Sequence, residues 1–234
     1  MIKYRNMTTI NWIFLSIIFI SLVLYLIALI KKNSLMAKIS SAFTIPFIAL
    51  LNLSLLYYYL PDSRHIILTT IIAMSLVTIS QILFLFENNI HARIAGRIAF
   101  ILSTCVWMEI YRATYYIYRL PVWFLTLALI IYAGIITWVL ILSGKQKFYK
   151  DFIFIIGLLI ASGMHYSTLA AFCMSPSLSS ILLTLGTTLT LVFIIIYFLD
   201  FAKYHFKFRK PLLFFILIAS QSLIMFSNLL LIKS

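Results

Sequence analysis

Long apolar runs alternate with short polar segments along the whole chain. Eight of these runs have close to the roughly 20 residues that a membrane-spanning helix needs, and the segments between them are too short to form soluble domains. The pattern therefore predicts an all-α polytopic membrane protein, with a single transmembrane domain built as a bundle of eight transmembrane helices. The expected helices are about 11–30, 39–60, 65–86, 94–117, 121–143, 152–173, 178–201 and 211–232.

Two of these helices need a further argument. Residues 152–199 carry no formal charge and are too long for one crossing, so we place a break at the Ser-Pro-Ser sequence around Pro176. The first run, from Trp12 to Ile30, is longer than the ~7–15 residues of a signal-peptide core and has no small-residue cleavage pattern after it. We expect it to remain as the first membrane helix.

Charge supports the membrane assignment and predicts an orientation. Charged residues make up 10% of the chain, against about 25% in soluble domains, and the net charge is +13. Twelve Lys and Arg residues lie in the odd-numbered interhelical segments and six on the opposite side, so the odd segments are expected in the cytoplasm and both termini outside the cell membrane. This placement favours the lipid bilayer as the partner of the cations and argues against nucleic acid.

Only five acidic residues exist, and four of them have ordinary explanations. Asp62 and Asp151 lie in interhelical segments, and Glu87 ends the third helix at the water boundary. Glu109 lies inside the fourth helix with Arg112 three residues later on the same face, so the two can form an ion pair within the membrane.

Asp200 is the acidic residue that stands out. It lies at the end of an apolar run, with Tyr197 three residues before it and Lys203 three residues after it. If the helix ends at residue 201, Asp200 is interfacial; if the helix continues through Phe206, Asp200 lies about two turns inside and faces other helices. A carboxylate there is a functional-site candidate because an unpaired charge is costly in a membrane.

Neutral polar residues suggest how the helices pack. Ser180, Thr184 and Thr188 recur every four residues, a pattern typical of close helix packing, and Gln221 and Asn228 share one face of the last helix. His165 lies near the middle of the sixth helix, either as a hydrogen-bonded structural residue or in proton handling. No residues have metal-ligand spacing, so we expect neither a metal nor another cofactor.

Several short motifs are similar to those of a known family. The C-terminal part resembles the lysoplasmalogenase-like, or YhhN-like, family of eight-helix integral membrane proteins. The residues that carry the resemblance are Leu199-Asp200, Phe208, Pro211 and Ala219-Ser220-Gln221, with looser matches at Lys38, Pro46 and Gly96-Arg97-Ile98-Ala99-Phe100. Four positions differ from the family pattern: Ser80-Gln81 stands for its Gly-Asp, Thr104 for its His and Trp107 for its Tyr.

The resemblance implies hydrolysis of the vinyl-ether bond of lysoplasmalogens by two carboxyl groups. One would protonate carbon, and the other would stabilise the resulting cation or orient water. Asp200 matches one of them, but Gln81 cannot ionise, so the second carboxyl group would have to come from Glu87 or Glu109. Of these, Glu109, inside the fourth helix, is the second catalytic candidate. Tyr197, His165, Gln81 and Gln221 are expected to contact the substrate, a membrane lipid or lysolipid.

Two other classes of function remain open from the sequence. The first is a non-catalytic lipid-binding, sensory or assembly protein, which the replacement of the family's aspartate by Gln81 favours. The second is a small-solute transporter, which would need two similar halves with interrupted helices. Pro46 interrupts only the second helix, with no matching break in the sixth, so the transporter ranks last.

Overall fold

In a computed structural model of the chain, the described residues are 9–59, 64–86, 89–114, 121–143, 152–201 and 208–231. These residues form eight α-helices and no strand, and every helix is long and apolar enough to cross a membrane. The predicted all-α, polytopic class is confirmed, and the chain is a multi-pass membrane protein. The helices are α1 Thr9–Ile30, α2 Ser34–Tyr59, α3 Arg64–Phe84, α4 Ile90–Thr114, α5 Val122–Ser143, α6 Phe152–Met174, α7 Leu178–Phe201 and α8 Arg209–Leu231.

The link between α1 and α2 is much shorter than the sequence predicted, because capping begins α2 five residues earlier. The backbone N–H of Asn33 donates to the carbonyl of Ala28 at 2.9 Å, and Lys32 adopts the left-handed conformation at φ 52°. This is the Schellman closure of a helix C-terminus. The Asn33 side chain then accepts from the N–H of Met36 at 3.0 Å and caps α2. The predicted loop is therefore a three-residue turn.

Two further helix boundaries differ from the prediction. Helix α4 begins at Ile90 rather than 94, because Oδ1 of Asn89 accepts from the N–H of His91 at 2.9 Å. Helix α3 ends at Phe84 rather than 86. Lys38, expected in a loop, lies within α2 and donates from Nζ to the carbonyl of Leu85 at 3.2 Å. A cation at a helix C-terminus is favourable because the last carbonyls carry partial negative charge.

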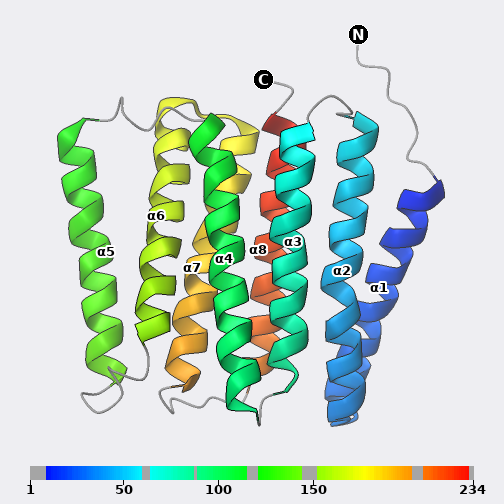
Figure 1. Cartoon of the computed structure of the whole chain (residues 1–234). Coiled ribbons are helices and arrows are strands. Elements are labelled where there is room, and N and C mark those ends of the chain that lie inside the picture. The colour runs from blue at the N-terminus through cyan, green and yellow to red at the C-terminus, as the bar shows by residue number, and fades with distance from the viewer. Residues whose placement is uncertain are drawn as a thin grey trace. The chain divides into compact units, whose positions relative to one another are not determined.

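The chain divides into two compact units, Met1–Gly96 and Arg97–Ser234. In unit 1, α2 lies between α1 and α3, and the first turns of α4 belong to the same unit (Figure 1). Gly96 meets the end of α3 so closely that a Cβ atom there would lie 2.8 Å from Cε1 of Phe84. A larger residue at this position would therefore have to displace the Phe84 ring.

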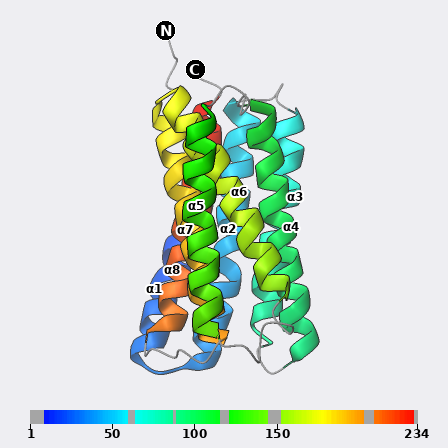
Figure 2. The ribbon, with the colours of Figure 1, turned by 90° about the vertical axis from the view of Figure 1, so that its left-hand side faces the viewer.

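In unit 2, α7 lies between α6 and α8, and α5 runs along the flank formed by α6 and α7 (Figures 1 and 2). Helix α4 packs against this row: the ring of Phe100 lies 5.0 Å from that of Phe193 in α7. A Cβ on Gly157 in α6 would lie 3.1 Å from the side chain of Ile101. Helices α6, α7 and α8 therefore form a closely packed row, which α4 and α5 contact less extensively.

Small residues bring α7 and α8 together. A Cβ added to Gly186 would lie 2.8 Å from Cγ1 of Ile224 and 3.1 Å from the carbonyl oxygen of Ser220. The Ser220 hydroxyl lies 3.0 Å from the Gly186 carbonyl and 2.6 Å from Oγ1 of Thr190. This is the small-residue packing that membrane helices use in place of a hydrophobic driving force.

The row of Ser and Thr predicted along α7 faces α6 at two of its three positions. Oγ1 of Thr184 lies 3.0 Å from the carbonyl of Thr168, and Thr188 contacts His165. Ser180 instead helps to cap the start of α7, where its hydroxyl and that of Ser177 each accept from the other's backbone N–H. The predicted break around Pro176 is confirmed by the ends of α6 and α7.

Candidate functional site

The end of α7 carries the two candidate residues Tyr197 and Asp200. The Tyr197 ring stacks on Phe193 with centroids 6.0 Å apart and lies 5.7 Å from the ring of Phe154 in α6. Asp200 follows one helical turn later within α7, and its side chain lies outside the described ones. The alternatives of an interfacial or an inward-facing Asp200 both stay open.

Arg97 lies against the same aromatic side chains. Its guanidinium carbon is 4.2 Å from the centroid of the Phe154 ring and 5.8 Å from that of Tyr197. The count of interhelical cations included Arg97, but the residue lies within α4 and is only 7% exposed. Cation–π contacts are strongest where water is excluded, so these rings help to keep a positive charge at this end of α7.

An apolar groove lies beside this cluster, between α5, α6 and α7. It is shallow, with a cavity volume of about 10 Å³, and Phe154 forms one wall of the groove while its ring also contacts Arg97. The lining residues are Ile136, Val139, Leu140, Phe154, Ile155, Leu158, Ile194 and Ile195. Its lining is entirely apolar, but a groove of this size cannot hold a hydrocarbon chain unless it widens.

His165 belongs to a separate polar cluster near the middle of the helices. Its Nδ1 lies 2.5 Å from the hydroxyl of Tyr132 in α5, and its Nε2 lies 2.9 Å from Oγ1 of Thr188 in α7. One imidazole thus connects three helices. Such hydrogen bonds between membrane helices contribute about 0.6 kcal/mol on average and up to about 1.7 kcal/mol.

The donors and acceptors in this cluster follow from one contact. Thr188 donates its single hydroxyl hydrogen to the carbonyl of Thr184 at 2.7 Å. Its oxygen must then accept from Nε2 of His165, so the ring hydrogen is on Nε2. Nδ1 is left as an acceptor, and the Tyr132 hydroxyl donates to it. Thr188 and His165 therefore each donate one hydrogen bond and accept one, and Tyr132 donates, as expected for a structural link.

Two amides on α8 have different surroundings. Oε1 of Gln221 accepts from Nε1 of Trp107 in α4 at 3.2 Å, so Gln221 links α8 to α4. Asn228, two turns later, is 1% exposed, and neither polar atom of its side chain has a partner among the described residues. A buried amide without partners lowers stability because it has lost its hydrogen bonds to water.

Leucine should have opposite effects at these two positions. Asn228→Leu should raise the free energy of unfolding by about 1–3 kcal/mol, because it removes two buried polar groups without partners. Gln221→Leu should lower it by about 1 kcal/mol, because the indole N–H of Trp107 loses its acceptor. Unfolding of the purified protein in mixed detergent micelles measures both. A loss of stability in Asn228→Leu would show that Asn228 binds water or another polar group.

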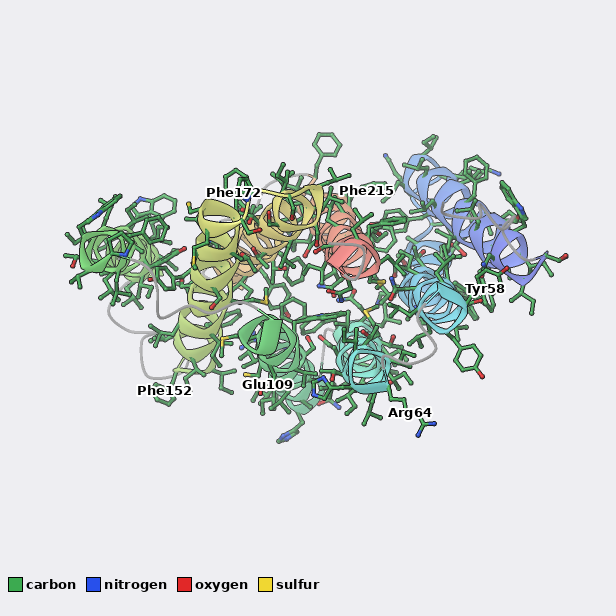
Figure 3. All side chains as sticks on the ribbon, turned by 90° about the horizontal axis from the view of Figure 1, so that it is seen from above. Tyr58, Arg64, Glu109, Phe152, Phe172 and Phe215 are labelled. Atoms are coloured by element: carbon green, nitrogen blue, oxygen red, sulfur yellow. The ribbon has the colours of Figure 1, made fainter. Side chains whose placement is uncertain are left out.

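The remaining candidates of unit 2 lie away from the groove. Glu109 is exposed on α4 (Figure 3), and it lies twelve residues after Arg97, about 18 Å along the helix axis. The side chain of Arg112, its predicted partner, is outside the described ones. Gln81 is half-buried in α3, within unit 1. Among the predicted site residues of unit 2, Tyr197 and Asp200 thus share one level, whereas Gln221, Glu109 and His165 lie elsewhere along the helices.

Sequence reasoning overlooked Arg97, Phe154 and Tyr132. Arg97 does have a signal in the sequence. Arg93 and Arg97 are one helical turn apart, so if one of them is near the start of the helix, the other lies a turn further inside it. Tyr132 is the hydroxyl-bearing residue at the centre of the otherwise apolar sequence LALIIYAGII. Phe154 has no such signal among the many phenylalanines of this chain.

Comparison with known proteins finds no match: no protein-family model, no curated protein and no solved structure matches the chain.

Proposed function

We propose that this protein binds a single-chain lysolipid and hydrolyses the vinyl-ether bond of lysoplasmalogens, as its resemblance to the lysoplasmalogenase-like family implies. The observation that carries the proposal is the apolar groove beside Arg97 and Tyr197, at the end of α7 that bears Asp200. The hydrocarbon chain lies along this groove, which must widen to hold it, and the positive charge of Arg97 favours the lipid phosphate nearby.

The proposed reaction needs one proton donor and one water molecule. Asp200, in its protonated form, transfers a proton to the vinyl carbon distant from the ether oxygen. Water adds to the resulting oxocarbenium ion and loses a proton, which restores the acid. The hemiacetal then breaks its carbon–oxygen bond and gives a fatty aldehyde and a glycerophosphodiester in which the former ether oxygen is a hydroxyl group. No oxidant or cofactor is required.

A non-catalytic lipid-binding protein is the second candidate, and one residue favours it. Gln81 stands where the resembling family has an aspartate, and an amide can orient water but cannot act as a carboxylate. In this case the groove and the cluster at Arg97 bind the lysolipid without turnover.

Purified protein in nanodiscs should release fatty aldehyde from added lysoplasmalogen, measured by mass spectrometry of the trapped aldehyde. The same preparation, extracted with organic solvent, should contain a single-chain lipid in near-stoichiometric amount. Bound lysolipid without aldehyde would support the non-catalytic candidate. The absence of both would exclude the two candidates together.

A further inference from the structure

The turn between α1 and α2 lies at the boundary of two membrane spans. Both helices are long and apolar enough to cross a membrane, and only Lys31, Lys32 and Asn33 separate them. The 22 residues of α1 extend over about 33 Å, close to the ~30 Å thickness of the hydrocarbon core. So short a turn stays in the headgroup layer, where the lipid phosphates lie.

Positive charge gathers at this end of unit 1. Lys31 and Lys32 are exposed, and Lys38 and Arg93 follow within the first two turns of α2 and α4, which begin at the same end of the unit (Figure 1). Among the described Lys and Arg residues of unit 1, only Arg64 lies at the opposite end. The described residues of unit 1 include no carboxylate side chain, so none of them neutralises Lys31 or Lys32.

Lys32 has a backbone conformation that is unusual for a residue with a side chain. Its φ of 52° lies in the left-handed region, and glycine is the usual residue at this position of a Schellman closure because it has no Cβ. Lysine is strained there, and a strained residue that persists points to a role of its side chain. What lysine has and glycine lacks is a positive charge at the level of the lipid phosphates.

We propose that the turn between α1 and α2 binds the headgroup of an anionic phospholipid, with the ammonium groups of Lys31 and Lys32 contacting its phosphate. Basic residues next to a membrane span attract anionic lipids, by roughly a factor of five for each residue. A zwitterionic headgroup has its own cation, which the two lysines repel, so it is bound less well. The site is independent of the function proposed above and does not require that the protein hydrolyses a lipid.

A local fluorophore can measure which lipid occupies the site. Ile30, the residue before Lys31, is 82% exposed, so a bimane group on Ile30→Cys faces the adjacent lipid, in a protein with Cys105→Ala and Cys173→Ala. Spin-labelled phosphatidylglycerol in nanodiscs should quench it at an at least about tenfold lower mole fraction than spin-labelled phosphatidylcholine. Added salt should weaken this preference. Both leaflets of a nanodisc have the same composition, so the orientation of the protein does not affect the result.

Two substitutions test the lysines themselves. Lys31→Gln and Lys32→Gly should each lower the preference for phosphatidylglycerol about fivefold. Lys32→Gly should at the same time raise the midpoint of thermal unfolding in a neutral detergent, because glycine adopts the left-handed conformation without strain. A loss of lipid preference in a more stable protein cannot result from misfolding.

A bimane group on Ile10→Cys is the matched control, because Ile10 is also exposed but lies at the opposite end of α1. Its quenching should not change in Lys31→Gln or Lys32→Gly. Equal quenching of the Ile30→Cys fluorophore by the two lipids, or an unchanged preference in both lysine variants, would exclude the site. If inorganic phosphate removes the preference at constant ionic strength, the turn binds free phosphate, and the proposal of a lipid site is wrong.

Discussion

Replacing Asp200 with asparagine should lower aldehyde release from lysoplasmalogen at least about 100-fold, the usual contribution of a general acid. Asparagine has nearly the same shape but no proton to transfer to carbon. Binding of the lysolipid should be retained, because the groove residues and Arg97 are unchanged. The measurements are the steady-state rate of aldehyde release and the amount of lysolipid bound at equilibrium.

Glu109→Gln is the informative control for Asp200→Asn. The sequence offers Glu109 as the second carboxyl group, but α4 places it about 18 Å along the helix from Arg97. We therefore expect Glu109→Gln to release aldehyde at close to the wild-type rate. A large loss in Glu109→Gln, together with a normal rate in Asp200→Asn, would reverse the assignment of the acid.

Gly186→Leu should destabilise unit 2 by about 3 kcal/mol or more, because a well-packed contact cannot accept a larger residue. Even a Cβ at this position would lie 3.1 Å from both the backbone nitrogen of Ile224 and the carbonyl oxygen of Ser220. Backbone atoms cannot rotate away as a side chain can, so α7 and α8 must separate. The measurement is the midpoint of unfolding in increasing sodium dodecyl sulfate.

Gly134→Leu provides the comparison on α5. No atom lies within 4 Å of a Cβ built at Gly134, so leucine should fit there without displacing another helix. Its unfolding midpoint should stay at or slightly above that of the wild type, because leucine favours a helix more than glycine does. Equal destabilisation by both substitutions would show that the α7–α8 contact is not the cause.

The number and approximate positions of the helices could be predicted from the sequence because hydrocarbon imposes a length on every crossing. The ends were less certain where a side chain caps the backbone. Asn33 and Asn89 begin α2 and α4 four to five residues before the expected positions. A capping residue acts through one hydrogen bond, whereas mean hydropathy is averaged over many residues. The average therefore does not locate the helix end that a cap fixes.

The partners of polar residues within helices could not be predicted in the same way. Gln221 and Asn228 share one face of α8 and look equivalent in the sequence, yet Trp107 reaches only Gln221. Likewise, nothing in the sequence of α6 selects Tyr132 as the partner of His165. These pairings depend on the rotation and depth of two helices that lie far apart in the sequence.

The three-residue turn between α1 and α2 also limits how the chain enters a bilayer during its synthesis. The backbone closure at Lys32 and the cap at Asn33 join the two helices directly. So short a link cannot leave α1 inserted across the bilayer while α2 extends away from it. We therefore expect α1 and α2 to insert together as a helical hairpin, with the buried Asn11 shielded from lipid from the start.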